Sequence, residues 1–216
     1  MISPEISIPN NFLVKMIIVQ AAEKRVHAQN VASVSAALAG LVGYTNDECH
    51  RVYLGAFLHD IGKQFVPDSI LEKPNALTRV EFENVQSHPL AGYIYLRRYI
   101  SDRIILNSVL YHHERLNGTG YPCGLKHDKI PLEARICTIA DVWDALFSNR
   151  CYHSAWDMSR ALEFILDGAG SHFDPKLVLL FLRLIEEDHI MNIPKVDGHV
   201  PDTIGRYLNL EFSSML

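Results

Sequence analysis

The chain has 216 residues, of which 48% are hydrophobic, and a net charge of −5 with both signs mixed along the sequence. This length predicts one domain with a sizeable buried core. No run of Lys and Arg marks a nucleic-acid surface, and no stretch approaches the roughly 20 apolar residues of a membrane span. A nucleic-acid polymer and a membrane are therefore not expected as partners. A small anionic substrate stays open, because bound metal adds positive charge.

The four cysteines form no C-x-x-C pair and no disulfide-like spacing: they are Cys49, Cys123, Cys137 and Cys151. The apolar stretch 12–22 is interrupted by Lys15 and has neither a basic leading segment nor a small-residue cleavage site. It is therefore not interpreted as a secretion signal. Together these features predict reduced thiols and a cytoplasmic protein.

Helical periodicity dominates the chain, and no strand series is evident, so the expected fold is an all-α bundle of about seven main helices. The expected helices span 12–42, 48–61, 78–100, 102–114, 132–150, 158–168 and 175–187. Gly43 is a natural stop, Thr78 with Glu81 has the pattern of a capping box, and Asp157 is a cap. Pro89 is expected to kink the 78–100 helix, with His88 in its interior. Segments 67–77 and 115–131 are expected to be irregular, and the structure of the tail 188–216 is left open.

The adjacent pair His59 and Asp60 offers an imidazole nitrogen and a carboxylate that can bridge two metals. A His-Asp dipeptide alone is a weak signal, but the chain supplies further candidate ligands. These are Glu23, His27, His88, His112, His113 and Asp141. The set exceeds what a single ion can use, which predicts a multinuclear metal site.

Each candidate also has an ordinary structural reading. Glu23 and His27 lie four residues apart on one helix face, and this spacing alone favours a solvated pair. His112 and His113 diverge by roughly 100° on a helix, so they suit different metals or a frayed helix end. Asp141 lies among apolar residues, where an unpaired carboxylate is costly, so a functional role is favoured. The remaining histidines are set aside as ligands: His50, His127, His172, His189 and His199.

Six blocks in order resemble the HD-GYP domain family. They are Leu58-His59-Asp60-Ile61-Gly62-Lys63, Ser87-His88-Pro89, His112-His113-Glu114-Arg115, Asn117-Gly118-Thr119-Gly120-Tyr121-Pro122, Ile139-Ala140-Asp141-Val142-Trp143-Asp144-Ala145-Leu146 and Gly170-Ser171-His172-Phe173-Asp174-Pro175. The resemblance runs from about residue 12 to residue 187. It implies a catalytic domain over 1–187 with a short lead-in, followed by the tail 188–216.

The resemblance implies a metal-dependent phosphodiesterase that opens cyclic di-GMP to pGpG through a metal-bridging hydroxide, and onward to GMP where a third metal is present. The superfamily's ligands would be His27, His59, Asp60 and Asp141, with Asp60 bridging. The HD-GYP additions would be His88, His112 and His113. Glu23 matches the position of a third-metal ligand. Two or three ions, of iron or manganese, are implied.

The same resemblance implies substrate contacts. Lys63 and Arg150 would bind phosphate, although exposed helix-end cations are the alternative. Tyr121, in a loop that also meets GGDEF domains in some relatives, would contact substrate or partner, unless that loop only packs on the core. His153 stands where a phosphate-gripping Lys or Arg is usual, and Asn30 where an arginine is common. Leu116-Asn117 replaces a more usual Trp-Asp.

Three other functions stay open. One is a phosphodiesterase that prefers cyclic GMP-AMP, and the second is a non-catalytic receptor for the dinucleotide or an interaction module for a GGDEF domain. The third is a generic nucleotide phosphohydrolase of the HD type. The complete ligand set argues against a non-catalytic module, and the paired histidines His112 and His113 with the Gly120-Tyr121-Pro122 block argue against the generic enzyme.

Overall fold

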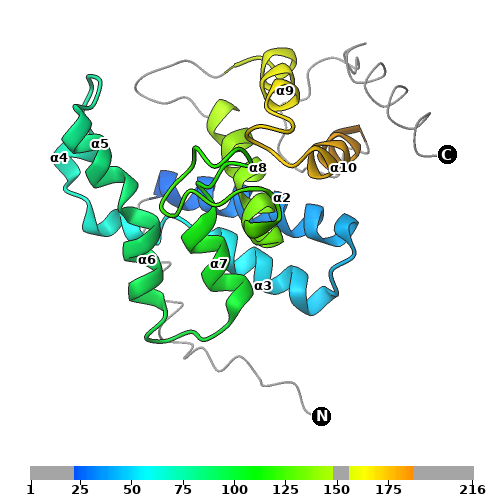
Figure 1. Ribbon diagram of the computed structural model, residues 1–216, viewed down its shortest axis with the longest axis horizontal. Coiled ribbons are helices and arrows are strands. Elements are labelled where there is room, and N and C mark those ends of the chain that lie inside the picture. The colour runs from blue at the N-terminus through cyan, green and yellow to red at the C-terminus, as the bar shows by residue number, and fades with distance from the viewer. Residues whose placement is uncertain (1–21, 148–155, 187–216) are drawn as a thin grey trace.

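A computed structural model describes residues 22–147 and 156–186 of the chain (Figure 1). The elements in chain order are α2 (Ala22–Val42), α3 (Asn46–Phe57), η1 (Ile61–Phe65), α4 (Asp68–Leu71), α5 (Arg79–Gln86), α6 (His88–Leu96), α7 (Arg103–Tyr111), η2 (His127–Lys129), α8 (Leu132–Phe147), α9 (Met158–Asp167) and α10 (Pro175–Glu186). Within those two ranges there is no strand, only one isolated bridge between Ala169 and Phe173. The all-α expectation is confirmed.

Helix α2 crosses the middle of the molecule, with α3, α8 and α10 packed against it (Figure 1). Helix α7 lies against both α3 and α8, and α6 packs on η1 and α7. One continuous core of buried aliphatic and aromatic side chains joins these helices, including Leu38, Leu58, Ile139 and Phe181. The packing brings α2, the α3–η1 turn, α6, α7 and α8 together around one point, where the polar side chains described below lie.

Several helix ends follow the local signals. Thr78 and Glu81 form the predicted capping box at α5, and Asp157 accepts a hydrogen bond from the Arg160 backbone N–H at α9. Gly43, with φ +100°, follows the end of α2 at Val42, since a left-handed residue costs glycine little. Residues 12–21 of the first predicted helix lie outside the described ranges.

The expectation of one kinked helix over 78–100 is wrong. Helix α5 ends at Gln86, and α6 begins at His88 with Pro89 in its first turn. Proline lacks an N–H and its ring clashes with the carbonyl one turn earlier, but both problems vanish at a helix start. His88 therefore opens a helix and does not lie inside one.

Two more predicted helices end earlier than expected. Helix α3 stops at Phe57, before His59 and Asp60, and the chain continues through a turn into η1. Helix α7 stops at Tyr111, so His112 and His113 lie at and beyond its end. The frayed-end alternative for the paired histidines is thus the observed one. In addition, the segment 67–77, expected to be irregular, contains the short helix α4.

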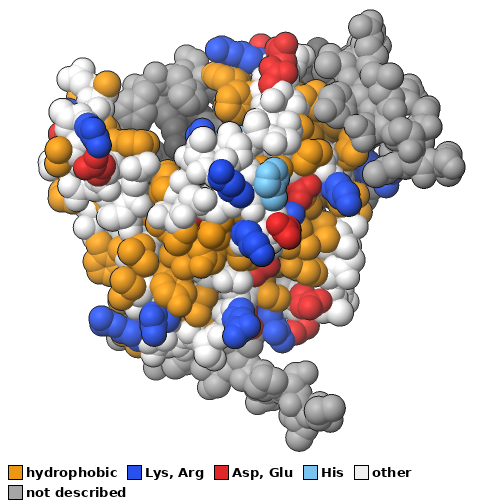
Figure 2. All heavy atoms as spheres, viewed as in Figure 1, with side chains coloured by type: hydrophobic (Ala, Val, Ile, Leu, Met, Phe, Trp, Pro, Cys, Tyr) orange, Lys and Arg blue, Asp and Glu red, His pale blue; other side chains and the backbone are white. Residues whose placement is uncertain are grey.

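The surface shows no dominance of one charge on the face seen in Figure 2, where basic and acidic side chains are interspersed. Hydrophobic side chains gather over the region of α6 on that face, and this helix exposes Leu90 and Ile94. Among the described helices, none combines the length and apolar character needed to cross a membrane.

Candidate metal centre

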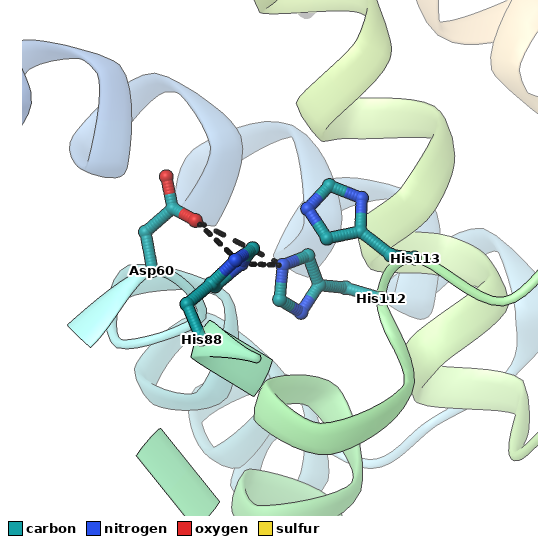
Figure 3. Close-up of side chains that lie close together, drawn as sticks. All are labelled: Asp60, His88, His112 and His113. Atoms are coloured by element: carbon teal, nitrogen blue, oxygen red, sulfur yellow. Dashed lines mark hydrogen bonds and ion pairs between the residues drawn. The ribbon is translucent and has the colours of Figure 1, made fainter. Parts of the chain in front are cut away.

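Two groups of side chains meet at the point where the five elements converge. The first ligand group consists of His27 from α2 together with His59 and Asp60 from the α3–η1 turn. The second ligand group consists of Asp60 again, His88 at the start of α6, and His112 and His113 at the end of α7 (Figure 3). Within each group the potential ligand atoms lie within 4.8 Å of one another.

Asp60 belongs to both groups because its two carboxylate oxygens face opposite ways. Its Oδ2 lies 3.4 Å from His59 Nε2 and 3.9 Å from His27 Nε2. Its Oδ1 lies 3.2 Å from His88 Nε2 and 3.9 Å from His112 Nε2. A carboxylate in this position has the geometry of a bridge between two ions.

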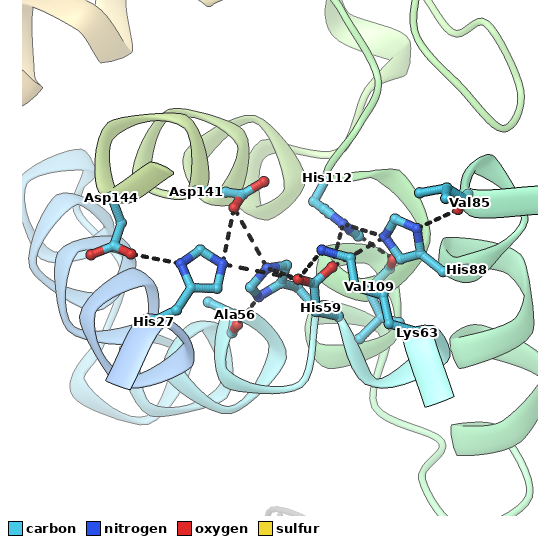
Figure 4. Close-up of polar contacts among 11 residues, drawn as sticks. His27, Ala56, His59, Lys63, Val85, His88, Val109, His112, Asp141 and Asp144 are labelled. Atoms are coloured by element: carbon cyan, nitrogen blue, oxygen red, sulfur yellow. Dashed lines mark hydrogen bonds and ion pairs between the residues drawn. The ribbon is translucent and has the colours of Figure 1, made fainter. Parts of the chain in front are cut away.

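Asp141 on α8 lies beside the first ligand group. Its Oδ1 is 3.3 Å from His27 Nε2 and 3.7 Å from His59 Nε2 (Figure 4). The carboxylate that stood out among apolar neighbours in the sequence therefore faces imidazole nitrogens.

Backbone carbonyl groups orient three of the histidine rings through their Nδ1 atoms. Nδ1 of His59 lies 2.6 Å from the carbonyl oxygen of Ala56, and Nδ1 of His88 lies 2.7 Å from that of Val85 (Figure 4). Nδ1 of His112 is 2.9 Å from the Val109 carbonyl oxygen. A carbonyl only accepts, so Nδ1 carries the proton in each ring and Nε2 presents its lone pair to the centre.

Within the part of the chain that the structure describes, some of the acceptor atoms at the centre have no hydrogen-bond donor. His59 Nε2 and Asp60 Oδ1 are buried there without any hydrogen-bond partner. The Nε2 atoms of His88 and His112 lie 3.2 Å apart, two acceptor atoms facing each other. Buried acceptors are normally satisfied, and a cation is the partner that satisfies several at once. The residues present thus fit divalent metal ions.

The electrostatics favour the ligand forms of most groups. Burial lowers the pKa of His113 to about 3 and also lowers that of His112, which keeps both rings neutral. Burial opposes ionisation of Asp60, but the charge of Lys63 holds its pKa well below the ordinary value. For His27, burial disfavours the charged ring, yet hydrogen bonds with Asp141 and Asp144 raise its pKa to about 9. A metal at His27 must displace that proton.

Two of the predicted substrate-contact residues lie at the centre. Lys63 on η1 places its Nζ 2.5 Å from Asp60 Oδ2. The Tyr121 ring packs on that of His113 with centroids 4.8 Å apart, and its backbone N–H donates to the His113 carbonyl at 3.1 Å. Burial, together with the charges of Asp60 and Asp141, raises the Tyr121 pKa, so its hydroxyl stays a hydrogen-bond donor.

The side chains of the other predicted site residues lie outside the part of the chain that the structure describes. Arg150 and His153 lie in the undescribed segment 148–155, and of Glu23 only the backbone, in α2, is described. Their roles stay predictions.

Three residues around the centre were not recognised from the sequence as parts of it. Asp144 faces His27, and Asn30 donates to Asp144. The spacing of Asp144 three residues after Asp141 on an apolar helix was a usable signal, because such residues share a face. Glu114, only 1% exposed, accepts hydrogen bonds from the Cys123 and Leu125 backbone N–H groups at 2.7 and 3.0 Å. No pattern in the sequence pointed to that loop clamp.

The sequence is similar to a known domain family and to several named phosphodiesterases. A sequence model of the family described as "HD domain" matches residues 12–177. The "Cyclic di-GMP phosphodiesterase response regulator RpfG" of Xanthomonas campestris pv. campestris is 41% identical over 159 residues, which cover 72% of this chain and 42% of that protein. The "3'3'-cGAMP-specific phosphodiesterase 2" of Vibrio cholerae is 38% identical over 169 residues, covering 76% of this chain and 32% of its own length. The chain thus spans less than half of each of these relatives.

Among solved structures, the HD domain of the L. monocytogenes phosphodiesterase PgpH, in complex with cyclic-di-AMP, superposes with a TM-score of 0.59 at 20% identity. The match covers 86% of this chain and 99% of that one. A cyclic GMP-AMP specific phosphodiesterase of V. cholerae gives a TM-score of 0.59 at 19% identity, covering 85% of this chain and 48% of the other. At these identities the likeness shows a shared fold.

Proposed function

We propose that this chain, which belongs to the HD domain family, is a metal-dependent phosphodiesterase that hydrolyses cyclic di-GMP. The observation that carries the proposal is the pair of ligand groups joined by Asp60. Divalent ions held by these two groups would supply the charge stabilisation that hydrolysis of a phosphodiester requires. Relatives named as cyclic di-GMP phosphodiesterases support this choice of substrate.

Seven described side chains would hold the metal: His27, His59, Asp60, His88, His112, His113 and Asp141. Divalent ions bound there supply Lewis acidity toward the phosphate and a nucleophile at neutral pH. We propose iron or manganese, because mixed imidazole and carboxylate ligands suit both. Glu23 would serve a third ion and so support the second cut, from pGpG to GMP.

The chain's own cation and phenol complete the proposed site. The Lys63 ammonium lies against Asp60, beside the place where a phosphate would meet the metals, so it would neutralise a non-bridging oxygen. The Tyr121 hydroxyl would donate to the anionic substrate, since its raised pKa keeps it protonated. Arg150 and His153 are proposed as further phosphate contacts, and the Tyr121 loop as a contact for a GGDEF partner.

A second candidate substrate is cyclic GMP-AMP, because a V. cholerae relative at 38% identity is named as specific for it. The two substrates differ in one base, so the shared metal centre does not distinguish them. The choice between them therefore rests on direct competition of the two substrates.

The test is anaerobic reconstitution with Fe(II) or Mn(II), followed by incubation with cyclic di-GMP and with cyclic GMP-AMP, with products separated by chromatography. Hydrolysis of cyclic di-GMP to pGpG is expected, with GMP following if Glu23 serves a third ion. Glu23→Ala should then preserve pGpG formation and slow the second cut. Bound metal without turnover of either dinucleotide would overturn the proposed activity.

A further inference from the structure

His27 differs from the other oriented histidine rings of the centre in the hydrogen-bond partner of its Nδ1 atom. Its Nδ1 lies 2.6 Å from Asp144 Oδ2, whereas His59, His88 and His112 use backbone carbonyls (Figure 4). Its side chain is also 17% exposed, against 0–1% for those three rings. A ring at the edge of the core has fewer packing contacts to fix it, so its hydrogen-bond partner carries more of the orientation.

Two carboxylates of helix α8 contact the two ring nitrogens of His27. The Oδ1 atom of Asp141 lies 3.3 Å from His27 Nε2. Asp144, nearly one turn further along the helix, accepts a hydrogen bond from His27 Nδ1. Because a carboxylate only accepts, Asp144 keeps a proton on Nδ1, so Nε2 is the nitrogen that can bind a metal at the first ligand group. A carboxylate partner also makes the imidazole a stronger donor to a metal than a carbonyl does.

Asn30 in turn holds Asp144. Its Nδ2 donates to Asp144 Oδ1 at 2.8 Å, so each oxygen of the Asp144 carboxylate contacts a side chain of α2. Asn30 lies three residues after His27, on the same face of that helix. The pair His27 and Asn30 on α2 thus meets the pair Asp141 and Asp144 on α8, and Asp144 is fixed in one orientation.

We propose that Asp144, oriented by Asn30, is a positioning residue that sets the metal affinity of the first ligand group and leaves that of the second unchanged. The inference rests on the proposed metal centre. Its selectivity follows from its contacts, because Asp144 bonds directly to His27 of the first ligand group and to Asn30 on the same helix as His27.

The experiment measures Mn(II) binding by equilibrium titration, with free ion followed by electron paramagnetic resonance. Asp144→Asn should weaken one of the two binding events by about 10- to 100-fold, the usual effect of removing a partner behind a ligating histidine, while the other event keeps its affinity. The matched control is Glu133→Gln, which changes another carboxylate of α8 that is equally buried (7% exposed against 8%) and bonds to Tyr44 and Asn107. It should leave both events unchanged.

Asn30→Ala is the second variant, because it leaves Asp144 in place and removes only its orientation. A smaller weakening of the same single binding event is expected. Unchanged affinity in both variants, or equal weakening of both events, would overturn the positioning role. Wild-type protein that binds two Mn(II) ions but cleaves no cyclic dinucleotide would refute the proposed function alone, since the comparison of affinities needs no turnover.

Discussion

At the scale of single residues, the centre is built from side chains whose protonation is set by their surroundings. His112 and His113 are driven neutral by burial, while His27 is held in its charged form between two carboxylates. In the metal-free protein, His27 of the first ligand group therefore carries a positive charge, whereas His112 and His113 carry none. This asymmetry makes its stability depend on pH in a defined way.

We predict that metal-free protein is most stable near pH 6.5 and loses about 3 kcal/mol of unfolding free energy by pH 9. The pKa of His27 rises from 6.5 to about 9 on folding, so its contribution is complete below 6.5 and is lost as pH rises through 9. Below 6.5 the sign reverses, because burial lowers the pKa of His113 to about 3 and of His172 to about 4, and the unfolded chain binds more protons.

Urea unfolding of chelator-treated protein at pH 5, 6.5, 7.5 and 9 checks this. His27→Gln should flatten the alkaline limb, whereas His50→Gln, an exposed substitution of the same kind, should leave it intact. An alkaline limb that persists in His27→Gln would place the titrating group elsewhere.

At the scale of elements, the close crossing of η1 and α6 joins the two ligand groups. A Cβ on Gly62 would lie 1.9 Å from the His88 carbonyl oxygen and 2.6 Å from the Gly92 nitrogen. Both are backbone atoms that cannot rotate away. The absence of a side chain at Gly62 is what lets Asp60 and His88 approach each other.

Gly62→Ala should therefore separate η1 from α6. We expect a loss of about 3 kcal/mol in stability, the upper end for overpacking, and at least about tenfold weaker metal binding by the second ligand group. Gly40→Ala in α2 is the control: its nearest contact would be Cys49 Sγ at 4.0 Å, so it should stabilise by up to about 1 kcal/mol. Unaltered metal binding in folded Gly62→Ala would show that the crossing is not needed for the centre.

The loop after α7 is a second element whose position depends on one residue. Glu114→Ala leaves the Cys123 and Leu125 N–H groups without this acceptor, at a cost of about 1 kcal/mol for each hydrogen bond lost. Because this loop carries Tyr121, the KM for the dinucleotide should rise about tenfold while metal content stays constant. Steady-state kinetics with metal analysis tests this, with exposed Glu83→Ala as the control. A fall in metal content instead would assign Glu114 to the metal centre.

The elements also show what the sequence could predict. Caps at Thr78 and Asp157 and the glycine stop at Gly43 are local signals, and the helix ends that depend on them are found as expected. The end at Phe57 was not foreseen, and the end at Tyr111 was only one of two alternatives, because nothing local breaks the helix at either place. Packing between helices places those ends, and with them the turns that hold the candidate ligands. The contacts of Asp144 and Glu114 were missed for the same reason, since each depends on a distant partner.

At the scale of the whole molecule, the centre ties together helices that are far apart in sequence. His27 comes from α2, His59 and Asp60 from the α3–η1 turn, and the other candidate ligands from α6, α7 and α8. In the absence of metal, neutral rings and unsatisfied acceptors face one another across this junction. Metal binding should therefore be coupled to the stability of the entire fold, not to one segment.

Saturating Mn(II) should accordingly raise the melting temperature by about 10 °C. Free ion at a thousandfold excess over Kd stabilises by about 4 kcal/mol, and a protein of this size gains about 2–4 °C per kcal/mol. Asp60→Ala should lose most of the increase, because Asp60 supplies an oxygen to both ligand groups, whereas Glu133→Gln should retain it. Calorimetry with and without chelator measures the difference. An equal increase in Asp60→Ala would mean that the stabilising ions bind outside the centre described here.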